Sequence, residues 1–365
     1  MALENLALSE TSDFPIRHEG NVHSGKVRSV YWLNETDSKN VYRKISGLEG
    51  NPQLGIMIIS DRISAFDCNW KGEDGLNGIP GKGAALNAIS QYWFNELGYG
   101  IGGNHILETP HPLVWIVQKA EPIMVEAIAR QYITGSMWRS YKKGEREFCG
   151  VILPEGLNEN QKLSDLLITP TTKGILQGIP GVPEKDDVNI TRKQIENNYK
   201  RFGFKSISDI AKYEYMLREG FDAISRVLEL NGQIFVDTKF EFGYAKRGGE
   251  YELIFIDEIG TPDSSRMWDA KEYARGRVVE NSKEGFRQFL LKTLDREVLL
   301  NSDRMNERKE LAKNYRVPVD QMMAVSETYA RMIDAITGMR PPKVGNAREE
   351  ILDVLSSYNI LESNK

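Results

Sequence analysis

The 365-residue sequence has little of what several protein classes depend on: it contains two cysteines, four histidines and no long hydrophobic run. Cys68 and Cys149 form no CxxC motif and the histidines do not cluster, so neither a disulfide framework nor a zinc site is indicated. No apolar stretch reaches the roughly 18 residues of a membrane span. The first residues lack the basic start and apolar run of a secretory signal. We therefore expect a cytoplasmic protein without a membrane partner.

The sequence also lacks an excess of positive charge. Lys and Arg number 47 against 52 Asp and Glu, for a net charge of −5. A protein with this balance has no overall basic field, so we expect no nucleic-acid partner. Any phosphate group must be bound by a local basic site. The 40% hydrophobic and 27% charged content is ordinary for a globular protein, and the length allows two or more domains.

The stretch from Gln233 to Trp268 carries the strongest pattern. Two apolar, β-rich runs flank a Lys-Arg-Gly-Gly turn, which is typical of a hairpin. In the first run Asp237, Lys239 and Glu241 alternate with apolar residues, so a strand would place all three charges on one face. Charged sheet faces are usually solvated, but the second run, YELIFIDE, is too apolar for an exposed edge.

The register of this hairpin decides where Asp257 lies. If the loop is Arg247–Gly249, Asp257 lies on the charged face, opposite Lys239 and diagonal to Glu241. Two carboxylates about 7–8 Å apart on diagonal positions can share a divalent cation. The hydroxyl-rich turn that follows ends in Arg266, which is a candidate phosphate contact. The pattern therefore predicts a Mg²⁺-phosphate site.

A small glycine turn runs into a strand near the N-terminus, within His23–Trp32. Gly25 permits close backbone approach to a phosphate, and Lys26 and Arg28, two apart on a strand, would share a face as counter-charges. One Gly-Lys pair falls short of both the GxGxxG and the Walker A patterns. Taken alone, an ordinary hairpin with surface lysines is the simpler interpretation.

The apolar run 54–60 predicts a buried strand, which would deliver Ser64 and Asp67 at its end. The alternative is a loop with local capping bonds. Lys82 then stands at the entrance of an amphipathic helix predicted over 85–97. A helix N-terminus favours an anion, so either a bound anionic ligand or screening by solvent would accommodate this lysine.

Two further strands are predicted at 112–117 and 123–129. Glu126 and Arg130 stand four apart, so both lie on one face of the second strand, where they could form an ordinary surface ion pair. Ser136 follows Gly135 in a turn that could accept a phosphate, with Arg130 supplying the charge.

The remaining chain is irregular from 139 to about 187 and mainly helical thereafter. A span this long without regular structure is usually a functional lid or a surface insertion. A capping signal predicts a helix that begins at Thr191. Apolar periodicity predicts a longer helix with a buried stripe over 210–228, which ends at Asn231–Gly232. Further helices are predicted over 285–300, 324–336 and 347–355.

Read together, these strings resemble the phosphoribosylaminoimidazole-succinocarboxamide (SAICAR) synthetase family. The matching strings, in family order from about residue 23 to 340, are GKVRSVY, SDRISAFD, IPGKGA, VEAIARQYITGS, LPEGLNENQKL, TPTTKG, VDTKFEFG and IDEIGTPDSSRMW. Any one of them is weak, but the ordered set is specific. The chain departs from the family where an acidic-His string such as HDENI is usual and GIPGVPEKDDVNI stands instead, which leaves the substrate contacts of residues 174–190 open.

The resemblance implies an α+β, bilobal fold similar to protein kinases and ATP-grasp enzymes. Residues 1–118 would form a β-rich lobe with the glycine loop, 119–300 a larger α/β substrate and metal-binding lobe, and 301–365 a C-terminal helical segment. The implied reaction joins carboxyaminoimidazole ribonucleotide (CAIR) to L-aspartate in purine biosynthesis, with ATP as co-substrate, Mg²⁺ as cofactor and an acyl phosphate as intermediate. Such chemistry needs positioning and charge more than a protein nucleophile.

The resemblance also implies roles for individual residues. The ATP phosphates would be bound by Gly25, Lys26 and Arg28, and the metal by Glu241, Asp257 and Glu126. The ribonucleotide phosphate would be bound by Arg130, Ser136 and Arg266, and its ribose and carboxylate by the catalytic pair Asp237 and Lys239. Further substrate groups would be bound by Ser64, Asp67 and Lys82.

Two other functions use the same residues. A small-molecule kinase on a similar scaffold would share Lys26 and the Glu241–Asp257 pair but would need a general base beside an acceptor hydroxyl. A catalytically silent nucleotide-binding module would not need both metal carboxylates and the full phosphate clamp. The sequence does not decide between a monomer and a homo-oligomer.

Overall fold

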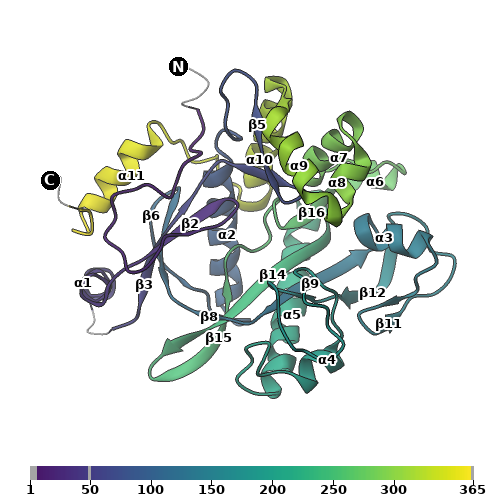
Figure 1. Ribbon diagram of the computed structural model, residues 1–365, viewed down its shortest axis with the longest axis horizontal. Coiled ribbons are helices and arrows are strands. Elements are labelled where there is room, and N and C mark those ends of the chain that lie inside the picture. Colours follow the sequence, from purple (N-terminus) through teal and green to yellow (C-terminus); the bar gives the residue numbers. More distant parts are fainter. Residues whose placement is uncertain (1–5, 48–50, 363–365) are drawn as a thin grey trace. The chain divides into compact units, whose positions relative to one another are not determined.

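The computed structural model describes residues 6–47 and 51–362 (Figure 1). Helices and strands are mixed along the chain and helices dominate its C-terminal part, which confirms the expected α+β class. Among these residues, none of the helices combines the length and the apolar character needed to traverse a bilayer. Contacts group the chain into two units. The first holds the described residues up to Ile89, Ile106–Lys119 and those from Ser282 onward; the second holds Ser90–His105 and Ala120–Asn281.

This grouping differs from the expected division into 1–118, 119–300 and 301–365. The C-terminal segment from Ser282 belongs with the N-terminal residues, and the second half of helix α2 (Lys82–Gly98) belongs with the second unit. Neither feature has a local signal, because both depend on which distant segments a helix packs against.

The first unit contains a five-stranded antiparallel sheet. Its order is β1 (His23–Ser24), β2 (Arg28–Trp32), β3 (Leu54–Ile59), β7 (Val114–Gln118) and β6 (Ile106–His111). Strands β3 and β7 are continuous apolar runs and are almost wholly buried, which confirms the strands predicted at 54–60 and 112–117. Helix α1 (Glu35–Ser46) packs on β3, and α11 (Ala347–Ser356) packs on β6.

A second sheet in this unit has three short strands. They are β4 (Ile63–Ala65), β5 (Cys68–Gly72) and β17 (Arg316–Val317), and the helices around them are α7 (Glu284–Thr293), α8 (Arg296–Leu300), η2 (Ser302–Arg304), α9 (Met305–Asn314) and α10 (Val319–Thr337). The helix expected over 285–300 is therefore two helices. Leu294 adopts an extended conformation, and the Asp295 side chain caps α8 by accepting from the amides of Glu297 and Val298.

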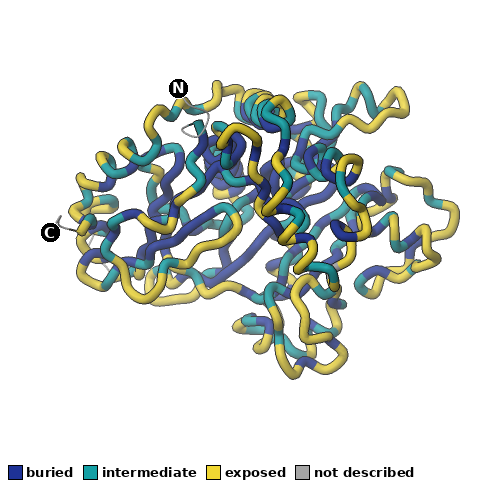
Figure 2. Tube along the Cα trace, turned by 45° about the horizontal axis from the view of Figure 1, so that its top comes forward, coloured by how far each residue is buried: buried dark blue, intermediate teal, exposed yellow. Residues whose placement is uncertain are grey.

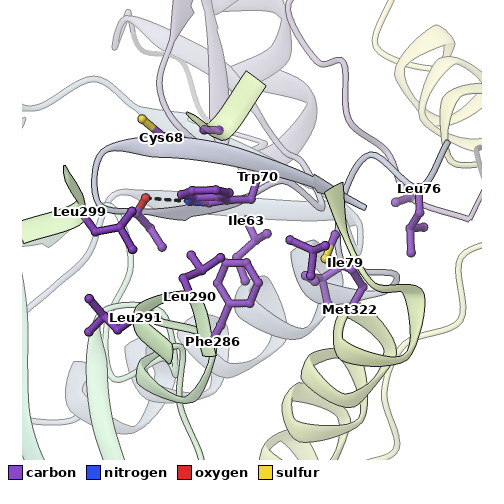
Figure 3. Packing of buried hydrophobic residues seen from close by; sticks show 14 residues of the cluster. Ile63, Cys68, Trp70, Leu76, Ile79, Phe286, Leu290, Leu291, Leu299 and Met322 are labelled. Atoms are coloured by element: carbon purple, nitrogen blue, oxygen red, sulfur yellow. Dashed lines mark hydrogen bonds between the residues drawn. The ribbon is translucent and has the colours of Figure 1, made fainter. Parts of the chain in front are cut away.

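The core of this part gathers around Trp70 (Figure 3). Leu290, Phe286 and Met322 approach it from α7 and α10, and the Trp70 indole donates a 2.9 Å hydrogen bond to the Ala65 carbonyl, so its polar group is satisfied. Buried positions run along the strands and exposed positions are frequent in the connections; Figure 2 shows the three burial classes on the Cα trace.

The second unit is built on a seven-stranded sheet. The central order is β12 (Lys162–Ile168), β9 (Val125–Tyr132), β14 (Gln233–Arg247) and β15 (Glu250–Ile256); β13 (Thr171–Thr172) adds to β9, and β8 (Glu121–Pro122) and β16 (Ser265–Asp269) add to β14. Strand β14 is long and mostly buried because it pairs with four neighbours. It therefore holds the charged alternation in the middle of the sheet.

Helices cover this sheet as the sequence predicts. The apolar stripe of α5 (Ser208–Leu230) is buried against β14 and β9, and the helix ends at Asn231 and Gly232. Helix α4 (Arg192–Asn197) begins with the expected capping box of Thr191 and Gln194. The shorter elements are α3 (Gly135–Lys142), β10 (Glu147–Phe148), β11 (Val151–Ile152) and α6 (Ala270–Ala274). The span 139–187 is thus less irregular than expected, since β10 to β13 lie within it.

Candidate active site

The β14–β15 hairpin has a different register from the expected one. Arg247 pairs with Glu250, so the turn consists of Gly248 and Gly249 alone, both with positive φ (57° and 91°). Two such residues form the tight turn whose twist suits a hairpin. The ladder then pairs Glu241 with Ile256. Asp257 does not pair with Lys239, and the expectation was wrong by one residue.

Asp257 nevertheless lies close enough to act on Glu241. It follows the last residue of β15 and adopts a left-handed conformation (φ 62°), so strand alternation no longer fixes its direction. Burial raises the pKa of Glu241, and the charge of Asp257 is the next largest cause. Asp257 and Glu241 are therefore neighbours, as expected, although Asp257 does not pair with Lys239.

Two lysines bridge the carboxylates on this face. Lys173 forms an ion pair with Glu241, and the Lys239 Nζ lies 2.7 Å from the Glu126 Oε1 and 3.5 Å from the Glu241 Oε1. Burial lowers the pKa of Lys239, but the charges of Glu241 and Glu126 outweigh this and raise it above its ordinary value. Both ammonium groups thus stand within a mainly acidic cluster, and that of Lys239 is held charged. We call these residues, with Asp257 and Asp187, the β14 cluster.

Asp187 joins this cluster from the loop whose contacts the sequence left open. Burial of its carboxyl group raises its pKa to about 6, and the charge of Glu126 is the next cause. The isolated bridge between Thr171 and Asn189 brings this loop to the sheet. Neither Asp187 nor Lys173 is among the site residues predicted from the sequence. The string TPTTKG contained Lys173, and the acidic pair before Asn189 was the available signal for Asp187.

The oxygen atoms of the β14 cluster have the chemistry that Mg²⁺ prefers. Burial is the largest cause of the raised pKa values of Glu241 and Asp187, and repulsion by the neighbouring carboxylates Asp257 and Glu126 adds to it. A cation would relieve this repulsion. Among residues 6–47 and 51–362, however, no three His, Cys, Asp or Glu side chains are close enough to hold an ion together, and Lys173 and Lys239 pair with two of the four carboxylates.

A second cluster on β14 contains two guanidinium groups around one carboxylate. Asp237 is buried, and its Oδ2 accepts from Arg130 Nη1 at 3.0 Å and from Arg266 Nη1 at 2.5 Å. Burial raises the pKa of Asp237, but the two arginines outweigh it and hold the pKa below its ordinary value. Arg130 also donates to the Thr169 hydroxyl at 2.9 Å. The arginines are thereby fixed in position.

Ser136 lies next to this pair of arginines because of Gly135. A β-carbon at Gly135 would lie 2.6 Å from the Arg266 Nη2, and the residue has φ 59°, so only glycine fits there. Gly135 and Ser136 begin α3, whose N-cap residue Thr134 makes no side-chain capping bond. The structure thus joins Arg130 and Arg266 through Asp237 and places the start of α3, with the exposed Ser136, beside Arg266; their role as a phosphate clamp stays a prediction.

In the first unit, the glycine turn differs from its expected geometry. The Gly25 amide donates to the Arg28 carbonyl at 2.7 Å, and Lys26 lies in the turn itself. Arg28 is buried, with its guanidinium 5.7 Å from the centre of the Trp115 ring. Lys26 is exposed and forms an ion pair with Asp67. The two cations therefore do not share a strand face, because only Arg28 belongs to the strand.

The other candidates of this unit have different surroundings. Ser64 is buried in β4, whereas Asp67 is at the tip of the β4–β5 turn with φ 61°. Lys82 is completely buried, with its Nζ 5.8 Å from the centre of the Tyr329 ring. The anion at the start of α2 is the Asp61 carboxylate, which accepts from the Gly83 amide at 2.8 Å. Because Lys82 is completely buried, screening by solvent does not accommodate it.

Comparisons with known proteins agree with this fold and these strings. The family model for SAICAR synthetase matches residues 21–298. The phosphoribosylaminoimidazole-succinocarboxamide synthases of Colwellia psychrerythraea and Vibrio vulnificus are each 57% identical, over 99% of this chain and 100% of theirs. The solved SAICAR synthase of Saccharomyces cerevisiae, complexed with SAICAR, has 25% identity and a TM-score of 0.63, and the match covers 92% of this chain and 99% of that chain.

These matches show that the protein is an ATP-dependent ligase of purine biosynthesis. The chain belongs to the SAICAR synthetase family. The match to these relatives covers 99% of this chain, so the resemblance extends beyond Gly338, where the strings fade. The kinase alternative is not favoured.

Proposed function

We propose that the β14 cluster is where this ligase activates the carboxylate of CAIR, before L-aspartate attacks it to give SAICAR, ADP and phosphate. The observation that carries the proposal is the meeting of Lys173, Lys239 and Glu241 on one face of the sheet. An anionic carboxylate and an anionic phosphate repel each other, so the half-buried ammonium groups of Lys173 and Lys239 beside them favour their approach.

The reaction needs no side-chain nucleophile. A carboxylate oxygen of CAIR attacks the γ-phosphorus of ATP, the bond to the leaving oxygen breaks, and ADP departs. The amine of L-aspartate then attacks the acyl carbon, phosphate leaves with its oxygen, and the amine loses a proton. We assign to Lys239 the contact with the reacting carboxylate.

The arginine cluster would bind the phosphate of the ribonucleotide. Arg130 and Arg266 present rigid planar donors, and Ser136 adds a hydroxyl at the start of α3. Asp237, which also remains our candidate for the ribose contact, holds both guanidinium groups in place. Their fixed position is consistent with a clamp that selects phosphate by its geometry.

Glu241, Asp257 and Glu126, with Asp187, would hold Mg²⁺ together with the ATP phosphates, whose oxygens would complete a ligand set that these side chains do not form alone. The ion would supply positive charge to the phosphate oxygens. The charges of the cluster support this assignment, because its four carboxylates have two ammonium groups, Lys173 and Lys239, as counter-charges. Repulsion by a neighbouring carboxylate adds to burial in raising the pKa values of Glu241 and Asp187.

The residues of the first unit would contact ATP and the remaining substrate groups. Gly25, Lys26 and Arg28 are assigned to the ATP phosphates, and Lys26 is the exposed cation among them. Ser64 and Asp67 stay candidates for substrate contacts, whereas the burial of Lys82 supports a structural role for that residue.

The test is a phosphate-release assay with ATP, Mg²⁺ and purified protein. Release should require CAIR and L-aspartate together. Appreciable release with only one of them would count against the proposed sequence of steps. A stable phosphorylated product, detected by mass spectrometry, would instead indicate a kinase.

We also propose a cytoplasmic location, supported by the two free thiols of Cys68 and Cys149. The proposed partners are the small-molecule substrates CAIR, L-aspartate and ATP. The choice between monomer and homo-oligomer stays a prediction for a sedimentation experiment.

A further inference from the structure

A pocket of about 390 Å³ lies on the first unit, beside strand β5. Its walls come from the β4–β5 turn, from α9 and from β17, and its lining consists of Asp67, Cys68, Asn69, Lys71, Lys309, Ala312, Lys313 and Arg316. Cys68 and Ala312 are buried and form an apolar floor. The polar residues of the rim are exposed. We call this the α9 pocket.

The fold concentrates four cations around the α9 pocket. Lys309 and Lys313 stand one turn apart on α9, so their side chains share a face. Lys71 and Arg316 are partners in the parallel pairing of β5 with β17, so they too lie side by side. Both arrangements place like charges next to each other, which is unfavourable unless an anion is near.

No acidic side chain among the described residues forms an ion pair with any of these four cations. The one carboxylate in the lining, Asp67, is already neutralised: it pairs with Lys26, and the Arg308 Nη1 lies 3.8 Å from its Oδ2. Burial raises the pKa of Asp67, but these cations hold it below its ordinary value, so it stays an anion bound to other partners.

The α9 pocket shares one residue with the sites assigned above. Asp67 lines the pocket and is also a candidate substrate contact that pairs with Lys26. None of the four cations belongs to the sites assigned above. The pocket is therefore not a part of the phosphate clamp or of the β14 cluster.

We infer that the α9 pocket binds a small phosphorylated anion. Lysine ammonium groups bind phosphate as point charges, and Asn69 can donate from its amide. The Arg316 Nη1 already donates to the carbonyls of Lys313 at 2.6 Å and Tyr315 at 3.1 Å, so Arg316 can add only its remaining N–H groups. The volume suits a small molecule, and the net charge of −5 for the whole chain does not favour a nucleic acid. The phosphate could belong to a free phosphate or pyrophosphate ion or to a nucleotide.

The experiment is calorimetric titration of the full-length protein with pyrophosphate at constant ionic strength. The double variant Lys309→Ala/Lys313→Ala should bind pyrophosphate at this site at least about tenfold more weakly, since it loses two charged contacts. The matched control is Lys39→Ala/Lys292→Ala, which removes the same charge from exposed positions on α1 and α7 outside the pocket. It should bind as the unaltered protein does.

A second variant separates this site from the clamp. Arg266→Lys should weaken ribonucleotide binding but keep the pyrophosphate event of the α9 pocket, and Lys309→Ala/Lys313→Ala should do the opposite and keep its turnover. Equal pyrophosphate binding by the pocket variant and the unaltered protein would overturn the inference. So would an equal loss in the control.

Parallel titrations with inorganic phosphate and AMP identify the source of the phosphate group. Tighter binding of AMP than of pyrophosphate, lost in the pocket variant, would support a nucleotide. Comparable binding of phosphate and pyrophosphate, lost in the same variant, would support the free anion. No saturable binding of any of the three probes would overturn the inference.

Discussion

Asp237 and Glu241 lie four residues apart on the same strand, and both are buried, yet their environments oppose each other. Two guanidinium groups surround Asp237 and hold its pKa below its ordinary value. Burial and the charge of Asp257 raise the pKa of Glu241 in spite of two lysines. The first cluster has a surplus of positive charge and the second a surplus of negative charge. One is suited to an anionic phosphate and the other to a cation.

The largest effect on stability should come from removing the charge of Asp237. Asp237→Asn leaves two buried guanidinium groups without their carboxylate, which should destabilise the second unit by about 3 kcal/mol. The midpoint of urea unfolding, followed by tryptophan fluorescence, measures this. Asp222→Asn, at an exposed position of α5, is the control and should change little. An unchanged midpoint for Asp237→Asn would show that the arginines do not depend on it.

Replacing Glu241, in contrast, should affect activity and not stability. Glu241→Gln keeps the size of the side chain but removes its charge, so turnover should fall by about a hundredfold or more. The folded state should remain as stable, because the unaltered carboxylate is itself disfavoured by burial. Steady-state phosphate release and a urea titration measure the two quantities.

The control for this change is Glu250→Gln, on an exposed position of the same hairpin. It removes an equal charge far along the strand, and its turnover should equal that of the unaltered protein. Retained turnover of Glu241→Gln at saturating Mg²⁺ would remove Glu241 from the proposed metal ligands.

A smaller change tests the geometry of the arginine cluster. Arg266→Lys keeps the charge but loses the planar fork that contacts Asp237, so ribonucleotide affinity should fall about tenfold. Calorimetric titration with the ribonucleotide measures it. Arg226→Lys, on the exposed face of α5, is the matched control. If affinity is equal in both variants, Arg266 does not belong to the clamp.

How far these clusters follow from the sequence depends on the range of the signal. Alternation placed Asp237, Lys239 and Glu241 correctly on one strand, and helical periodicity located α5, because both patterns are local. The predicted pairing of Asp257 with Lys239 was wrong, because a turn that is shorter by one residue changes the register of the whole hairpin.

Contacts made by loops were beyond the reach of local patterns. Lys173 and Asp187 reach the β14 cluster only because β13 and its bridge to Asn189 bring a distant loop to β9. The buried state of Lys82 was missed for a similar reason. Its partners, Asp61 and Tyr329, come from segments on either side of it that are far apart in the chain.

The smallest predicted effect concerns the carboxylate at the edge of the acidic cluster. Nuclear magnetic resonance of the Asp187 carboxyl carbon should show a titration near pH 6, because burial and then the charge of Glu126 raise its pKa to about 6. A carboxyl whose pKa is higher in the folded than in the unfolded state lowers stability as the pH rises through that interval. This is the reverse of the behaviour expected for Asp237, whose contribution is lost as the pH falls.

Glu126→Gln removes the neighbouring charge, so the pKa of Asp187 should shift downward in that variant while burial still keeps it above the value of a free aspartate. The stability lost between about pH 4 and pH 6 should then be smaller than in the unaltered protein. Glu250→Gln serves again as the control, because it lies on the hairpin but contributes nothing to this pKa. An unmoved titration in Glu126→Gln would mean that the acidic surplus of the β14 cluster does not include Asp187, and the comparison with Asp237 would then rest on Glu241 and Asp257 alone.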